Sequence, residues 1–230
     1  MKDIDVRSHP ARVIVLIGMP ASGKSTVGVL LAKRLGLAFV DTDLLIQEQA
    51  GATLAEIIAQ KGHTALRTIE EQVLLDMHIG ASVISTGGSV VYSGAIMRRL
   101  TQSSTVVYLR ATLETVAYRI SLAPDRGIAS PGNHTLEDVF NERVPLYERY
   151  AHATVNVDSD ATEVIAGHIS QAWETGAGWG DTAESGSRRG GLSDYRPDEL
   201  AQSLQPSVDS RSLERISKKH QEDARGREYL

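Results

Sequence analysis

Short apolar runs alternate with amphipathic stretches from residue 11 to about residue 173 of this chain. Short runs of β-branched and aliphatic residues are typical of buried parallel strands, and apolar positions every three to four residues are typical of helices. We expect strands at Val13–Ile17, Ala38–Val40, Ser82–Thr86, Thr105–Leu109 and Thr154–Val157. We expect helices at about 24–35, 44–50, 54–61, 65–78, 93–100, 112–120, 135–150 and 162–173. This alternation predicts an α/β fold in which helices flank a five-stranded parallel sheet.

Two stretches depart from the alternation. Residues 122–134 contain two prolines, two glycines and few apolar residues, and a loop of this length inside a compact domain is usually functional or mobile. Beyond about Trp173 the chain is rich in glycine, serine and balanced charge, a composition typical of disorder. We therefore predict one folded domain over residues 1–173 and a mostly disordered polar tail over residues 174–230. A partner-binding peptide is the alternative interpretation of the tail.

Composition narrows the possible functional classes. The net charge of −5 argues against non-specific binding to nucleic acid or to an anionic membrane. The chain has no cysteine, which excludes disulfides, thiolate catalysis and zinc–sulfur sites and suits a reducing compartment. No apolar run approaches the length of a transmembrane helix. We expect a cytoplasmic protein with no nucleic-acid or membrane partner.

The stretch from Gly18 to Ser25, Gly-Met-Pro-Ala-Ser-Gly-Lys-Ser, fits the spacing of a phosphate-binding loop. In such a loop the backbone N–H groups surround the β-phosphate, Lys24 reaches the β- and γ-phosphates, and the Ser25 hydroxyl ligates Mg²⁺. A strand is expected directly before this loop and a helix that ends at Gly36 directly after it. The motif therefore has the context it requires, and it predicts a site for a nucleoside triphosphate with Mg²⁺.

Three further clusters accompany the loop. Asp41 and Asp43 follow the second expected strand, at the sheet edge where open α/β sheets bind ligands, so one carboxylate can serve Mg²⁺ and the other can face an acceptor hydroxyl. Gly87 and Gly88 follow the third strand and allow a ligand to approach the backbone closely. Three arginines suit a small anionic substrate: Arg67, Arg126 and Arg143. The alternatives are a solvated turn with Asp43 as a helix N-cap, and ordinary surface arginines.

Taken together in order, these motifs resemble the shikimate kinase family. The matching segments, between about residues 11 and 169, are GMPASGKSTVG, FVDTD at 39–43, GHTALRTIE at 62–70, STGG at 85–88, the Arg126 loop and ERVPLYERYA at 142–151. The resemblance implies a P-loop NTPase fold with a mobile lid, and a phosphotransferase with an alcohol acceptor. Its reaction would be ATP-dependent phosphorylation of the 3-hydroxyl of shikimate, within aromatic amino-acid biosynthesis. The resemblance also implies a monomer.

The resemblance further implies a role for each matched residue. Asp43 would hold the acceptor hydroxyl and could take its proton, and the catalytic residues would be Lys24, Asp43 and Arg126. Arg126 would close over the phosphates, Arg119 would lie against the adenine, and the ATP site would comprise Ala21, Ser22, Gly23, Lys24, Ser25, Thr26, Arg119 and Arg126. The residues that hold shikimate would be Asp43, Arg67, Gly88 and Arg143, with the two arginines on its carboxylate. Mg²⁺ would bind Ser25 and, through water, Asp41, while Glu70 would steady Arg67.

The chain also departs from the family pattern near the substrate. The differing residues, with the usual family residue in parentheses, are Ile58 and Leu66 (Phe), His63 (Glu), Ser89 (Gly) and Gly127 (Pro). The changes at Ile58, Leu66 and Ser89 favour a second hypothesis, a relative that phosphorylates a different hydroxy acid. A third hypothesis is a non-catalytic, nucleotide-binding regulatory module whose tail recruits a partner.

Overall fold

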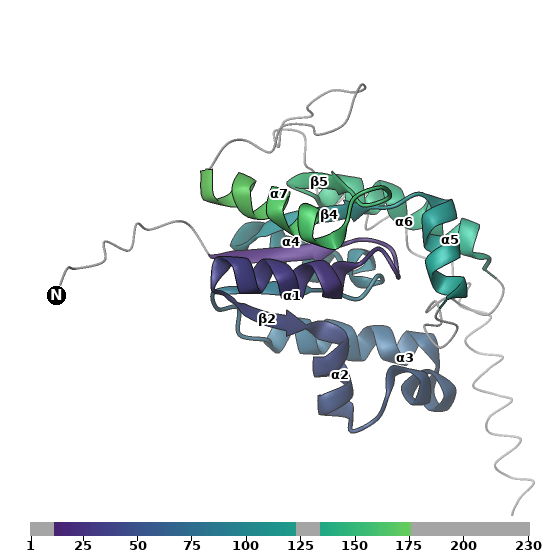
Figure 1. The fold of residues 1–230 in the computed structure, drawn as a ribbon. Coiled ribbons are helices and arrows are strands. Elements are labelled where there is room, and N and C mark those ends of the chain that lie inside the picture. The colour runs from purple at the N-terminus through teal and green to yellow at the C-terminus, as the bar shows by residue number, and fades with distance from the viewer. Residues whose placement is uncertain (1–11, 123–133, 176–230) are drawn as a thin grey trace, which may run out of the picture. The chain divides into compact units, whose positions relative to one another are not determined.

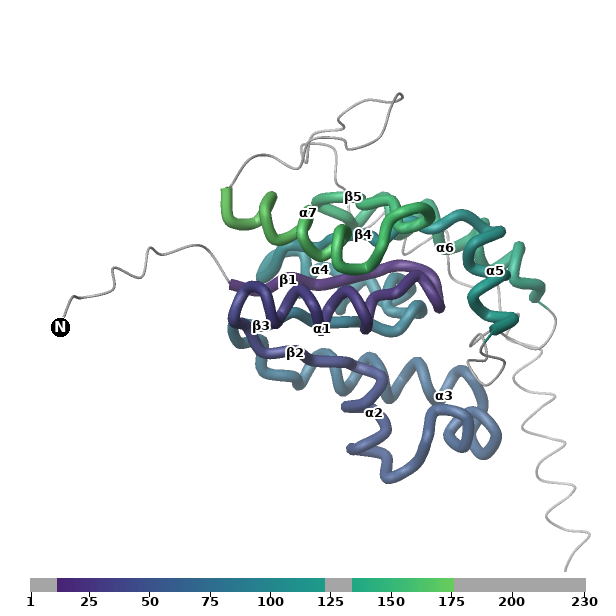
Figure 2. The backbone as a smooth tube through the Cα atoms, viewed as in Figure 1, coloured from purple at the N-terminus to yellow at the C-terminus, as the bar shows by residue number. Residues whose placement is uncertain are grey.

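The sheet has β1 at its centre. The computed structural model describes residues 12–122 and 134–175. Its five strands run parallel in the order β2-β3-β1-β4-β5 (Figures 1 and 2). Their bounds are β1 Val13–Ile17, β2 Ala38–Asp41, β3 Ser82–Ser85, β4 Thr105–Arg110 and β5 Ala153–Asn156. All residues of β1 and β3 are buried, which explains why both strands are continuous apolar or small-residue runs instead of alternating ones.

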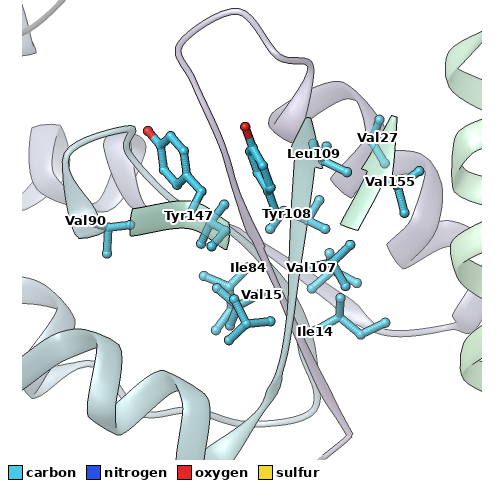
Figure 3. Packing of buried hydrophobic residues seen from close by; sticks show 14 of the residues in the cluster. Ile14, Val15, Val27, Ile84, Val90, Val107, Tyr108, Leu109, Tyr147 and Val155 are labelled. Carbon is cyan, nitrogen blue, oxygen red and sulfur yellow. The ribbon is translucent and has the colours of Figure 1, made fainter. Parts of the chain in front are cut away.

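Helices cover both faces of this sheet. Their bounds are α1 Lys24–Leu35, α2 Thr42–Ala50, α3 Leu54–Asp76, α4 Gly94–Ser103, α5 Leu113–Ser121, α6 Leu136–Tyr150 and α7 Thr162–Thr175, with a 3-10 turn, η1, at Val90–Tyr92. Figure 3 shows successive residues of β4 pointing to opposite sides. Tyr108 points toward Tyr147 of α6, and its ring stacks on that of Tyr147 at a centroid distance of 5.2 Å. Leu109 points toward Val27 of α1.

The sequence predictions for these elements are confirmed, with small shifts at several boundaries. The expected helices 54–61 and 65–78 are both present: they are the two helical segments of α3, which meet at a kink where Gly62 has non-helical backbone angles (φ 80°, ψ 170°). Helix α2 begins at Thr42, two residues earlier than expected, because Asp41 and not Asp43 is its N-cap. The Asp41 side chain accepts a hydrogen bond from the backbone N–H of Asp43. Thr53 caps α3 through a capping box with Glu56.

Parts of the predicted organisation lie outside the described residues. The predicted lid, which includes Arg126, falls within residues 123–133, and the predicted tail lies outside the description from residue 176 onward. Helix α7 extends to Thr175, two residues beyond the predicted boundary at 173. Among the described helices, none is both long enough and apolar enough to cross a membrane.

The carboxyl ends of β1, β2 and β3 lie next to one another. Leu16 of β1 and Asp41 of β2 both pair in register with Ser85 of β3. The phosphate loop therefore leaves the sheet beside Asp41 and beside the glycines that follow β3. This edge is where the motif residues from three distant parts of the sequence meet.

Gly18 is a position in this edge where an added side chain would clash with the backbone of a strand. Its φ is 149°, and a Cβ atom there would lie 2.7 Å from the carbonyl oxygen of Leu109, a backbone atom of β4. We expect Gly18→Ala to lower the free energy of unfolding by about 2–4 kcal/mol, because the clash is with a strand that cannot move aside. Gly36→Ala is the matched control, since Gly36 also has a positive φ, 64°, but has no atom within 4 Å of the added Cβ. It should cost only about 1 kcal/mol, and equal losses in urea denaturation would contradict this assignment.

Candidate active site

The phosphate loop is held in shape by its own lysine. Lys24, at the start of α1, is 8% exposed, and its Nζ donates hydrogen bonds to the carbonyl oxygens of Gly18 (2.9 Å) and Met19 (2.8 Å). The backbone N–H of Ser22 donates to the Met19 carbonyl at 3.1 Å. Thr26 lies exposed in the first turn of α1. The loop thus places the ammonium group inside its turn, at the N-terminal end of α1, where the partial positive charge of the helix favours an anion.

Ser25 and Asp41 lie together beside this loop. The Ser25 hydroxyl donates to Asp41 Oδ2 at 2.7 Å and lies 3.3 Å from the hydroxyl of Ser85. Hydroxyl and carboxylate oxygens are ligands that Mg²⁺ accepts, and this ion usually completes its shell with water and substrate phosphates. Among the described residues no group of three or more acidic or histidine side chains is arranged to hold a metal alone. The pair therefore fits a Mg²⁺ ion that is held mainly by a nucleotide and water.

Asp43 and Glu70 approach the same point of the backbone. A Cβ atom on Gly87 would lie 2.5 Å from Glu70 Oε1 and 3.0 Å from Asp43 Oδ1. The backbone N–H of Gly87 donates to the Thr42 hydroxyl at 3.1 Å, which fixes the start of α2 against this segment. A side chain at residue 87 would displace at least one of these two carboxyl groups. The Thr86-Gly87-Gly88 segment therefore brings the acidic end of β2 and α2 close to α3.

Glu70 is a buried carboxyl with only one oxygen hydrogen-bonded. It is 4% exposed; the Ser89 hydroxyl donates to its Oε2, and its Oε1 has no hydrogen-bond partner among the described residues. Burial is the main cause that raises the pKa of Glu70 to about 7. The hydrogen bond from Ser89 lowers this pKa. The negative charge of Asp43 raises it further, and the positive charges of Arg143 and Arg67 lower it. The expected partnership of Glu70 with Arg67 is therefore only electrostatic, and the hydrogen bond comes from Ser89.

Glu70→Gln should change how stability depends on pH. The folded-state pKa of about 7 lies above the ordinary value of 4.5, so the folded chain binds the Glu70 proton more tightly than the unfolded chain does. Protonation of Glu70 therefore stabilises the folded chain. Its contribution to the free energy of unfolding is complete below about pH 4.5 and is lost as the pH rises through 7, a change of up to about 3 kcal/mol. In urea denaturation at pH 5 and pH 8, Glu70→Gln should lose less stability between the two values than the wild type. An equal loss of stability in Glu70→Gln and the wild type would contradict the raised pKa of Glu70. The control is Glu48→Gln, because Glu48 is exposed.

The arginines meet at an aromatic ring. Arg143 of α6 is 1% exposed, and its Nε donates to the hydroxyl of Tyr92 at 3.2 Å. The guanidinium carbons of Arg67 and Arg143 lie over the Tyr92 ring, 4.4 Å and 5.2 Å from its centroid. A Cβ atom on Gly88 would lie 3.0 Å from Arg143 Nη1 and 3.0 Å from Pro20 of the phosphate loop. The structure thus brings Arg67 and Arg143 together at Tyr92, and it brings Arg143 and Gly88 together next to that loop.

Arg119 braces the loop from another direction. Its guanidinium donates to the Val157 carbonyl at 2.7 Å and, over longer distances, to the carbonyls of Ala21 (3.4 Å) and Ser22 (3.5 Å). These contacts tie α5 to the phosphate loop and to the residue after β5. The role of Arg119 against an adenine ring stays a prediction, as does the role of Arg126, which lies outside the described residues.

Sequence reasoning missed the tyrosines of the site. Tyr92 contacts both arginines, and Tyr147 donates from its hydroxyl to the Gly88 carbonyl at 2.6 Å. The spacing of Tyr147 from Arg143 places both on one face of α6, a signal that could have found it. No local pattern marks Tyr92. Leu66 belongs to a buried apolar cluster of α2 and α3 against which Ile58 packs, and Nδ1 of His63 is buried without a hydrogen-bond partner among the described residues.

The comparisons with known proteins agree with this geometry. A family model described as shikimate kinase matches residues 20–174. The shikimate kinase of Paracidovorax citrulli is 38% identical over 152 residues, which are 64% of this chain and 83% of that protein. That of Vibrio campbellii is 37% identical over 166 residues, 71% of this chain and 96% of that protein.

Solved structures show the same fold. The shikimate kinase from Acinetobacter baumannii in complex with shikimate has a TM-score of 0.66 at 31% identity, covering 73% of this chain and 95% of that one. The shikimate kinase from Aquifex aeolicus has a TM-score of 0.60 at 28% identity, covering 72% of this chain and 98% of that one. The family match spans more than half of the chain and includes the residues gathered at the sheet edge from Pro20 onward. This chain therefore belongs to the shikimate kinase family, a family of phosphotransferases with an alcohol acceptor.

Proposed function

We propose that this chain transfers the γ-phosphoryl group of ATP to the 3-hydroxyl of shikimate, giving ADP and shikimate 3-phosphate. The observation that supports this best is the position of Gly88. Gly88 lies against both Pro20 of the phosphate loop and the Arg143 guanidinium, since a Cβ atom there would lie 3.0 Å from an atom of each. A small acid gripped by Arg143 would therefore lie directly beside the phosphates. The relative from Acinetobacter baumannii was solved with shikimate bound, which supports this choice of acid.

The two arginines suit a carboxylate. A guanidinium presents a planar fork of N–H donors that matches a carboxylate bidentately, whereas an ammonium group is only a point charge. Arg143 is almost fully buried, so its contact with an anion would be little screened by solvent. The guanidinium groups of Arg67 and Arg143 both contact the ring of Tyr92. We assign the carboxylate of the substrate to this pair.

Asp43 is the group that we place at the acceptor hydroxyl. Its Oδ1 would lie 3.0 Å from a Cβ atom on Gly87, one residue before Gly88, beside which we place the acid. A carboxylate there can accept a hydrogen bond from the hydroxyl and take its proton as the bond to phosphorus forms. Because phosphoryl transfer has a loose transition state with spread charge, the chain contributes mostly positioning and electrostatic stabilisation. Lys24 would supply positive charge to the β- and γ-phosphates from within the loop.

Mg²⁺ is the proposed metal. Ser25 would hold it directly and Asp41 through water, in agreement with the oxygen donors that these residues offer. When bound with ATP, the ion neutralises charge on the phosphate oxygens. The expectations of a lid closed by Arg126, of a monomer and of a cytoplasmic location stay predictions.

Leu66 and Ile58 favour a second candidate function, the phosphorylation of a hydroxy acid other than shikimate. Both are aliphatic residues of the α2–α3 cluster at positions where the family usually has phenylalanine. A change of pocket shape of this size alters discrimination by only about 1–3 kcal/mol. A different hydroxy acid is therefore the alternative substrate, and a panel of hydroxy acids beside shikimate would reveal it.

The proposal is tested by ADP release from the purified chain of 230 residues. With Mg²⁺ and ATP, we expect release to depend strongly on added shikimate. No stimulation by shikimate, with ATP binding intact, would overturn the proposed substrate. A chain ending at residue 175 separates the regulatory hypothesis, since a kinase should keep nearly full activity without residues 176–230 and a tail-dependent module should not.

A further inference from the structure

We infer that Tyr92 is a positioning residue that holds both substrate-binding arginines in the geometry needed for a carboxylate. The residue ends η1, outside every motif that marks the family in this sequence. The inference rests on the proposed function, because it takes Arg67 and Arg143 as the groups that bind the substrate carboxylate. It adds a residue that would set the affinity for the acid without taking part in phosphoryl transfer.

The ring of Tyr92 is the point where two distant helices meet. Arg67 reaches it from α3 at 4.4 Å and Arg143 reaches it from α6 at 5.2 Å, measured from each guanidinium carbon to the ring centroid. Both distances are within the range of about 6 Å in which an aromatic face attracts a cation. Two arginines that converge on one anion site repel each other before the anion binds. A shared aromatic ring offsets part of that repulsion, and it does so without adding a negative charge that would compete with the substrate.

The hydroxyl of Tyr92 fixes the orientation of one guanidinium. It accepts a hydrogen bond from Arg143 Nε at 3.2 Å. Burial raises the pKa of Tyr92, Arg143 opposes the rise, and a hydrogen bond to Glu142 adds to it, so the phenol keeps its proton at neutral pH. Nε is therefore occupied by Tyr92, and the substrate would have to be met by another part of the guanidinium. Nη1 is the atom that would lie 3.0 Å from a Cβ on Gly88, at the proposed substrate space.

This arrangement should act on substrate binding more than on chemistry. A long side chain that is already fixed loses little rotamer freedom when its anion binds. Removing the fixing group therefore weakens binding of the acid, while the phosphate loop and Asp43 keep their contacts. Tyr92 is only partly buried, so smaller residues can replace it without opening a cavity in the main core.

The test compares Tyr92→Phe and Tyr92→Leu with the wild type in steady-state kinetics. Tyr92→Phe keeps the ring and loses the hydrogen bond to Arg143, and we expect the KM for shikimate to rise about fivefold. Tyr92→Leu loses the ring as well, and we expect a rise of about 30-fold. In both variants kcat should stay within about threefold and the KM for ATP within about twofold of the wild type.

A double variant separates positioning from general damage. In an Arg143→Lys background no Nε is present at the Tyr92 hydroxyl, so adding Tyr92→Phe should raise the KM for shikimate no further. Unchanged KM values for shikimate in both single variants would overturn the inference. So would equal losses in kcat and in both KM values together with a lowered melting temperature. A wild-type chain with no shikimate-dependent ADP release would instead contradict the proposed function, and this inference with it.

Discussion

Asp43→Asn is expected to bind ATP as tightly as the wild type and to lose about 10²–10⁴-fold in shikimate-dependent turnover. The asparagine is nearly the same size as the aspartate, but it can neither take the proton of the acceptor hydroxyl nor carry the charge that faces it. The hydrogen bond to Asp41 at 3.0 Å comes from the backbone N–H of residue 43, so the cap of α2 survives the change. ADP release and nucleotide binding, measured on the same preparation, check both halves of the expectation.

The result at Asp43 has a matched control. Asp160 is an exposed aspartate that follows β5, and Asp160→Asn removes the same charge at the end of the sheet opposite β2. It should retain wild-type turnover. If Asp43→Asn also turns over shikimate at the wild-type rate, Asp43 is not the group at the acceptor hydroxyl.

Arg143→Lys is expected to raise the KM for shikimate about 100-fold with little change in the KM for ATP. Lysine keeps the positive charge, so the loss isolates the planar fork and the Nε bond to Tyr92 at 3.2 Å. The penalty should be large because Arg143 is 1% exposed, and water cannot replace the donors that the lysine lacks. Kinetics at varied shikimate and fixed ATP give the value, and thermal unfolding shows whether the variant is folded.

The control for Arg143 is on the same helix. Arg149 of α6 is exposed, with its guanidinium carbon 5.7 Å from the centroid of the Tyr150 ring. Arg149→Lys should leave the KM for shikimate unchanged. A wild-type KM in Arg143→Lys would remove this arginine from the substrate site.

Much of the fold could be predicted from the sequence because its strands are apolar and its helices carry local boundary signals. β1 is predicted with its exact bounds as a continuous apolar run, and Thr53 and Gly36 mark a helix start and a helix end through contacts within a few residues of each. The errors have local causes that sequence does not resolve. Asp41 and Asp43 are both good N-caps, and only the backbone conformation at Asp41 decides between them. The expected break between residues 61 and 65, by contrast, is present at Gly62.

Part of the candidate site could be predicted, namely the residues whose spacing in a sequence motif fixes their positions relative to one another. The phosphate loop and the Ser25–Asp41 pair lie where their spacing indicates. The contacts that distant elements create could not be predicted. Ser89, in the segment after β3, donates a hydrogen bond to Glu70, and Tyr92 contacts one arginine of α3 and one of α6. Tertiary packing creates these contacts, and no periodic pattern in the sequence indicates them. These contacts are therefore the part of the candidate site that the sequence motifs do not describe.

The most direct test of the central claim is to identify the product formed from shikimate. The chain is incubated with Mg²⁺, ATP and shikimate, and the mixture is followed by phosphorus and proton NMR. The proposed reaction predicts one new phosphate ester on the 3-hydroxyl, formed in the same amount as ADP. ADP that appears with inorganic phosphate alone, or a phosphate ester on a different hydroxyl, would contradict it.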